Sequence, residues 1–90
     1  MKKTYLISYD LDKPGQNYDG LIGRLRALGA VKVLYSEWIF ATTASAVAIR
    51  DDLRRFVDAN DMLLVVGLTG EAAWTSLMIG DQAFKNALAA

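Results

Sequence analysis

The sequence contains no cysteine and no histidine among its 90 residues. The absence of cysteine excludes disulfides and cysteine-based zinc sites. The absence of histidine removes the usual metal ligand, the usual general base and every nucleophile system that depends on an imidazole. Any catalysis must therefore use carboxylate, lysine, tyrosine or hydroxyl groups, and we expect it to need a hard metal ion.

An excess of charge of either sign is also lacking, because ten basic residues balance ten acidic ones. We therefore expect no broad basic face for non-specific nucleic-acid binding. No apolar run approaches the ~20 residues of a membrane-spanning helix. The basic residues 1–4 precede an apolar run that is too short for a signal peptide. These features predict a cytoplasmic protein without a membrane partner.

Apolar residues are abundant and make up 53% of the chain. A chain of this length builds one domain, so we expect residues 1–90 to form a single domain. Small domains leave much of their surface exposed. A short chain this apolar is therefore expected to complete its burial against a second copy, which predicts a homodimer.

The first half of the chain alternates between strand and helix patterns. Residues 4–9 are rich in β-branched and aromatic types and predict a strand, with Asp10 at its end. Residues 18–28 repeat apolar types at helical spacing and predict a helix that ends at Gly29. Residues 31–35 and 37–42 predict two further strands. They form either a tight hairpin near Leu34 to Glu37 or one long bent strand.

The second half begins with a predicted helix whose N-cap is Ser45 and whose buried face holds four apolar residues: Ile49, Leu53, Phe56 and Val57. Residues 62–68 form a continuous apolar run, which is typical of a strand that is covered on both faces or used at an interface. Residues 71–90 predict one or two short helices, packed on the domain or across a dimer.

This order of elements predicts an α+β fold, a single ferredoxin-like β-α-β-β-α-β domain over residues 1–90 with a short helical C-terminal tail. Right-handed crossovers would place the first and third strands at the centre of the sheet and both helices on one face. The other face would carry apolar surface, to be covered by the tail or by a second subunit.

Several short motifs resemble those of the small CRISPR adaptation family ("Cas-two"), and most closely its SinR-like branch. The resemblance extends over nearly the whole chain. The motifs that carry it are Tyr9-Asp10-Leu11, Leu28-Gly29, Ser36-Glu37-Trp38, Ser45-Ala46, Asn60-Asp61 and a tail that contains Trp74.

The resemblance implies a ferredoxin-like fold, a homodimer and, for some members, a metal-dependent nuclease. In those members the aspartate that matches Asp10 comes from both subunits and holds a divalent ion, here Mg²⁺ or Mn²⁺, near the dimer axis. Asp10 is thus the predicted catalytic residue and metal ligand. Tyr9, Asp12, Lys13 and Ser36 are the predicted substrate-binding residues.

Four of these residues also have a structural alternative. Asp10 could cap the amides of Asp12 or Lys13 in an Asx-turn, and Asp12 could be a simple turn residue. Lys13 could be a solvated loop cation that makes no phosphate contact. The hydroxyl of Ser36 could satisfy the backbone of the hairpin.

Two functions follow from these observations. The first is a homodimeric metal-dependent endonuclease acting on RNA or DNA. The second is a non-catalytic dimeric module that binds a protein partner or nucleic acid, in a CRISPR-like or toxin–antitoxin-like role. The loop after Asp10 favours the second, because the nuclease-type members carry arginine there and this chain has only Lys13. The neutral net charge and the apolar tail favour it as well.

Overall fold

The computed structural model of the chain describes residues 1–12 and 18–90. It contains four strands and three helices in these residues. In chain order they are β1 (Lys3–Asp10), α1 (Asp19–Ala27), β2 (Val31–Leu34), β3 (Glu37–Thr42), α2 (Ala46–Arg54), β4 (Met62–Gly67) and α3 (Asp81–Ala89).

The strands form one sheet in the order β2-β3-β1-β4, and every neighbouring pair is antiparallel. The protein is therefore an α+β fold. The predicted hairpin is confirmed, because β2 and β3 pair directly across the turn of Tyr35 and Ser36. The alternative of one long bent strand is wrong. Strands β1 and β3 occupy the centre of the sheet, and β4 lies at one edge.

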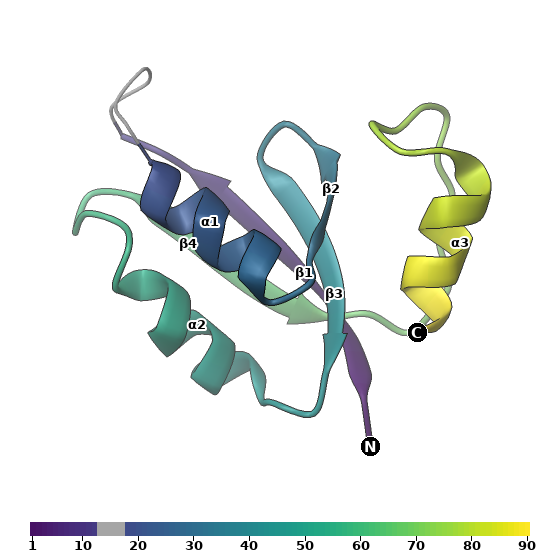
Figure 1. Cartoon of the computed structure of the whole chain (residues 1–90), viewed down its shortest axis with the longest axis horizontal. Coiled ribbons are helices and arrows are strands. Elements are labelled where there is room, and N and C mark those ends of the chain that lie inside the picture. The colour runs from purple at the N-terminus through teal and green to yellow at the C-terminus, as the bar shows by residue number, and fades with distance from the viewer. Residues whose placement is uncertain (13–17) are drawn as a thin grey trace.

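Helices α1 and α2 lie along one face of the sheet, whereas α3 lies apart from them beyond β3 (Figure 1). Successive side chains of β1 alternate between the two faces. We call the face with Tyr5, Ile7 and Tyr9 the helical face, and the opposite face with Leu6 and Ser8 the tail face.

The main core fills the space between the helical face and the two helices. Its fully buried members include Ile7 from β1, Leu21 and Leu25 from α1, and Leu53 from α2. Burying each such side chain contributes about 1.5–3 kcal/mol. The helices therefore owe their positions mainly to this apolar layer.

The predicted helix ends agree with the local chemistry. Ser45 caps α2, because its hydroxyl accepts a hydrogen bond from the Ala48 N–H at 3.1 Å. Gly29 follows α1 with φ of +86°, a left-handed conformation that residues with a Cβ avoid. The predicted buried face of α2 is confirmed at Ile49 and Leu53. Phe56 and Val57 lie beyond the end of the helix and are half-buried.

The C-terminal tail folds back on the chain's own sheet. Phe84 of α3 is buried against Ile39 and Val33 of the tail face. The ring of Trp74 meets Phe84 edge-on with 4.6 Å between the ring centroids. The Thr4 hydroxyl also donates to the Leu88 carbonyl at 3.2 Å. The tail thus covers the part of the tail face that lies over β1, β2 and β3.

Strand β4 departs from the prediction that both of its faces are covered. Leu63 and Val65 are half-buried on the helical face, but Met62 and Leu64 are 67% and 55% exposed on the tail face. The tail does not reach them. Use of this strand at an interface stays a prediction. Among the described residues, every helix is too short to span a bilayer.

Candidate functional site

Asp10 is exposed at the end of β1, opposite Met62 of β4. Alternation along the strand puts its side chain on the tail face, two residues from Ser8. The Ser8 hydroxyl donates a hydrogen bond to Glu37 Oε2 at 3.0 Å, and Glu37 is also the cross-strand partner of Ser8. Asp10, Ser8 and Glu37 therefore form a small polar group at the end of the tail face.

Sequence reasoning did not assign a function to Ser8 or Glu37. The signal for Ser8 was present, because a residue two positions before Asp10 in a strand shares its face. Glu37 belongs to a different strand, so only the β1–β3 register brings it to Ser8.

Tyr9 lies on the opposite face from the Asp10 carboxylate. Its side chain is buried in the main core, and its hydroxyl accepts a hydrogen bond from the Trp38 indole at 3.1 Å. Its backbone N–H donates to the Ser36 carbonyl at 3.1 Å. The Tyr9 side chain thus organises the core behind the candidate site.

Ser36 is exposed in the β2–β3 turn, and its carbonyl ties that turn to β1 through Tyr9. Asp12 is exposed just beyond β1. Lys13 lies outside the described residues. The predicted substrate-binding residues are therefore not gathered on one surface: the Tyr9 side chain faces the core, whereas Asp12 and Ser36 are exposed.

The carboxylate of Asp61 accepts hydrogen bonds from three residues. Its Oδ1 accepts hydrogen bonds from the Asp12 N–H at 2.7 Å and from the Tyr18 hydroxyl at 3.1 Å. Its Oδ2 accepts from the Asp58 N–H at 2.7 Å. Asp10 therefore does not cap the Asp12 amide in an Asx-turn, because Asp61 accepts from that amide instead. The other form of that turn, with the Lys13 amide, lies outside the described residues. The sequence signalled Asp61 only as part of the Asn60-Asp61 motif before an apolar strand.

The residues around Asp10 were compared with what a divalent ion needs. Mg²⁺ prefers six oxygen ligands and keeps several waters, so one or two carboxylates suffice when a substrate phosphate completes the shell. Within residues 1–12 and 18–90, no three acidic side chains lie close enough together to hold a metal ion. A single chain thus offers Asp10, with Glu37 in the same polar group, but among its described residues no cluster of three acidic ligands. A second copy would supply a second Asp10.

An ion-paired cluster joins α1 to α2. Arg24 Nε lies 2.8 Å from Asp52 Oδ2, and Arg55 pairs with Oδ1 of the same carboxylate. Burial raises the pKa of Asp52, but the hydrogen bonds from Arg55 and Arg24 lower it by more, and the net pKa lies below the ordinary value. The charged face of α2 therefore also fastens the two helices together.

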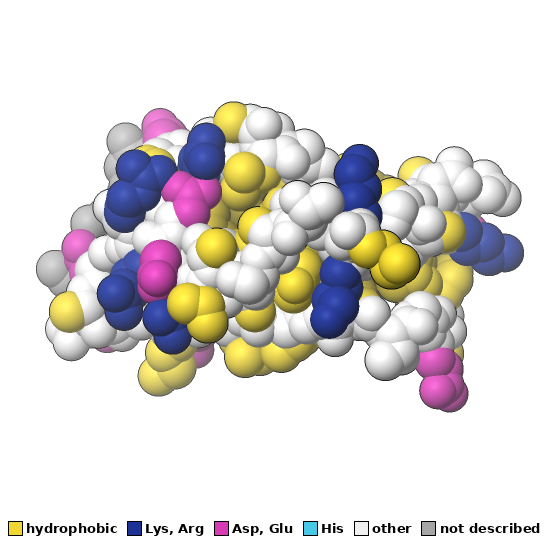
Figure 2. All heavy atoms as spheres, turned by 90° about the horizontal axis from the view of Figure 1, so that it is seen from below, with side chains coloured by type: hydrophobic (Ala, Val, Ile, Leu, Met, Phe, Trp, Pro, Cys, Tyr) yellow, Lys and Arg dark blue, Asp and Glu magenta, His cyan; other side chains and the backbone are white. Residues whose placement is uncertain are grey.

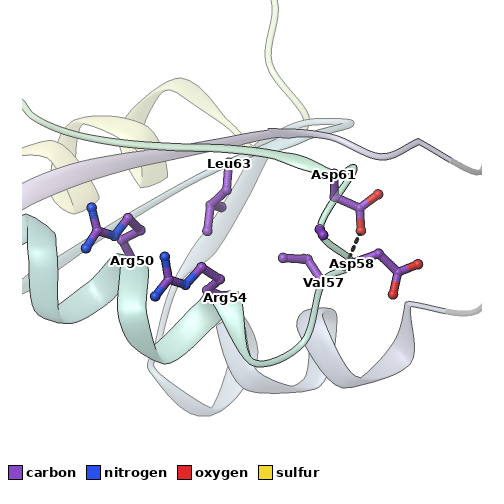
Figure 3. Close-up of a pocket in the computed structure, with 7 residues that line it drawn as sticks. Arg50, Arg54, Val57, Asp58, Asp61 and Leu63 are labelled. Atoms are coloured by element: carbon purple, nitrogen blue, oxygen red, sulfur yellow. Dashed lines mark hydrogen bonds between the residues drawn. The ribbon is translucent and has the colours of Figure 1, made fainter.

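Hollows open on both sides of β4. One of about 170 Å³ lies beside Asp10 and is lined by Ser8, Tyr9, Asp10, Met62, Leu63 and Leu64. A larger one, of about 410 Å³, lies between α2 and the start of β4 (Figure 3). Its lining combines two arginines, two carboxylates and an apolar floor: Arg50, Arg54, Val57, Asp58, Ala59, Asp61 and Leu63.

No protein-family model matches the chain, and no solved structure matches it.

Proposed function

We propose that the protein is a homodimeric binding module built on a ferredoxin-like fold. The order β-α-β-β-α-β, followed by the tail helix, supports this fold. The sheet order β2-β3-β1-β4 and the placement of α1 and α2 on one face support it as well.

One observation carries the proposed dimer. Met62 and Leu64 are large apolar side chains that stand exposed, two residues apart, on the tail face of β4. The tail covers the neighbouring strands and stops short of them. Exposed apolar patches on a folded domain commonly mark contact surfaces. A second copy placed over this row would bury it and would bring the two Asp10 residues toward the same interface.

Light scattering tests this proposal. At tens of micromolar the wild-type chain should show twice its monomer mass of 9.9 kDa. Leu64→Lys should return it to the monomer, since a buried unpaired ammonium strongly disfavours association. Leu34→Lys is the matched control, because Leu34 is 42% exposed but belongs to β2, at the opposite edge of the sheet. A wild-type monomer at that concentration would refute the dimer.

A second candidate function is a metal-dependent endonuclease, favoured by the exposure of Asp10 at the edge of the same row. Asp10 from each copy would be the ligand for Mg²⁺ or Mn²⁺. A bound ion of this kind lowers the pKa of its water and offsets charge on a phosphate. The chain's own part would be to supply the two carboxylates and, through Asp61, to hold the backbone of Asp12, two residues beyond Asp10.

The variant Asp10→Ala distinguishes the two functions. RNA or DNA should be cut faster by the wild type with Mn²⁺ than by Asp10→Ala if the protein is a nuclease. Equal rates for the two proteins would end the nuclease proposal. Partner binding that is independent of metal, and equal for wild type and Asp10→Ala, would support the non-catalytic module.

A further inference from the structure

The outer edge of β4 offers backbone groups for pairing. Within the described residues β4 pairs only with β1. The Leu68 N–H donates to the Thr4 carbonyl at 2.9 Å, so Leu68 and Thr4 are a hydrogen-bonded pair just beyond the end of β4. In an antiparallel pair, alternate residues direct their N–H and C=O groups toward the partner strand. Leu63, Val65 and Gly67 therefore direct theirs outward, away from β1.

A groove runs along this same edge, between β4 and α2. The hollow of about 410 Å³ described above occupies one end of it. A second hollow of about 200 Å³ shares Arg50 and Leu63 with the first and continues toward Val47 and Val65. The groove thus has Arg54 at one end and Val47 at the other. It follows β4 for the length of about five extended residues at roughly 3.4 Å each.

The wall that α2 contributes is positively charged. Arg50 and Arg54 lie one helical turn apart and rise from α2 beside Leu63 (Figure 3). Asp51 pairs with Arg50 at 2.9 Å and reaches Arg54 only at 3.9 Å. One carboxylate therefore serves two guanidinium groups. The far end of the groove carries the carboxylates of Asp58 and Asp61, and the Asp61 oxygens already accept hydrogen bonds from the protein itself.

The surface around the groove is consistent with this arrangement. Viewed from below, charged side chains of both signs cluster at the end of the molecule where α2 lies, and hydrophobic side chains gather beside them toward the middle (Figure 2). A ligand along β4 would meet Arg50 and Arg54 of α2 on one side and the exposed Met62 and Leu64 on the other.

We propose that β4 and α2 bind an extended peptide segment of a partner protein that alternates acidic with apolar residues. The segment adds to the sheet as a fifth strand through the backbone groups of Leu63, Val65 and Gly67. Its side chains alternate between the two sides of the enlarged sheet. Those that face α2 carry a carboxylate to Arg50 and Arg54, and those on the other side extend the apolar row of Met62 and Leu64.

A second copy of this chain suits the groove less well than such a peptide. The β4 sequence, residues 62–67, contains no acidic residue to meet the arginines. Two-fold pairing of β4 with β4 would also set the two α2 helices side by side. Arg50 and Arg54 of one copy would then approach the same residues of the other, and like charges in such contact are destabilising.

The proposed peptide site rests on the proposed role as a binding module, but its test is separate from the test of the dimer. The probes are two blocked seven-residue peptides, one alternating valine with glutamate and one alternating valine with lysine. Fluorescence anisotropy of each labelled peptide is measured with the full chain. We expect the glutamate peptide to bind at least about tenfold more tightly, as one good charge pair at the groove would produce.

Variants locate the binding. Val65→Pro removes an outward N–H while leaving the β1–β4 hydrogen bonds intact, because proline is tolerated where a strand's N–H faces solvent. It should abolish binding, whereas Val65→Thr should retain it. Arg54→Glu should reduce affinity for the glutamate peptide about tenfold and increase it for the lysine peptide. Arg26→Glu, an exposed change on α1, is the charge-matched control and should change neither.

Heteronuclear NMR of the full chain checks both folding and location. The amides of Leu63, Val65 and Gly67 should shift on titration with the glutamate peptide, and the Val65→Pro spectrum should remain that of a folded protein. Equal affinity for the two peptides, or shifts confined to other strands, would overturn the proposal. So would concentration-dependent shifts of these amides in Leu64→Lys without peptide, because the dimer proposed above is disrupted in that variant and a second copy would then be the occupant of the groove. A preference for a single-stranded oligonucleotide over the glutamate peptide would overturn it as well.

Discussion

The indole N–H of Trp38 donates a hydrogen bond to the hydroxyl of Tyr9 at 3.1 Å inside the main core. Both side chains are buried on the helical face, where β1 and β3 lie side by side. Tyr9 immediately precedes Asp10, so this bond helps to fix the strand end that presents Asp10 on the opposite face.

Tyr9→Phe should destabilise the fold by about 1–3 kcal/mol, because the buried Trp38 N–H loses its acceptor. The free energy of unfolding in urea measures this. Tyr35→Phe is the matched control, since the Tyr35 side chain is 83% exposed and its change should stay within about 0.5 kcal/mol. Equal effects of the two substitutions would mean that the bond contributes nothing to stability.

Asp61→Ala should destabilise the protein by about 2 kcal/mol, because three donors lose an ionised acceptor. Hydrogen exchange should also accelerate at the amides of Asp12 and Asp58. Asp58→Ala removes a neighbouring carboxylate while keeping the backbone N–H that Asp61 binds, so it should have little effect. An unchanged exchange rate at Asp12 in Asp61→Ala would contradict this role.

The ion-paired cluster around Asp52 predicts that the free energy of unfolding depends on pH. The pKa of Asp52 is lower in the folded than in the unfolded chain, so its contribution to stability is fully present above the unfolded value of about 3.9. That contribution is lost as the pH falls through the lower folded pKa. Asp52→Asn should remove about 0.5–1 kcal/mol at neutral pH and flatten the acid limb of the stability curve.

Asp51→Asn is the control for this titration, since Asp51 is exposed and pairs only with arginines of its own helix. Unfolding free energies measured from neutral pH down to about pH 3 compare the two variants. A curve for Asp52→Asn that remains parallel to the wild-type curve would exclude the contribution of this carboxylate.

Phe84→Ala should lower the free energy of unfolding by about 3 kcal/mol, because it leaves a cavity between α3 and the tail face. The fluorescence of Trp74 should change with it, since the two rings are in contact. Lys85→Ala, at the exposed neighbouring position, should leave both stability and fluorescence unchanged. An equal loss of stability in Phe84→Ala and Lys85→Ala would argue against the packing role of the tail.

Much of the fold follows from local patterns. Alternation in residues 4–9, helical spacing at Leu21 and Leu25, the Ser45 cap and the turn at Gly29 each act within a few residues. These features predicted all four strands, both central helices and the hairpin. The helical tail was predicted only in outline, because its position depends on Phe84 and Trp74 meeting a distant strand.

The sequence by itself determined which chemistry is open to this protein. Without histidine or cysteine, the candidate groups are carboxylate, lysine, tyrosine and hydroxyl groups, with Asp10 at a strand end. Only the tertiary structure decided the neighbours of that residue. In the folded chain Ser8 donates a hydrogen bond to Glu37, and the Tyr9 side chain is buried in the core. The Asp12 amide donates to Asp61, 49 residues away in the chain. It also left β4 at the sheet edge beside Arg50 and Arg54. Such contacts depend on strand register and on helix packing against the sheet, which residue patterns along the chain do not encode locally.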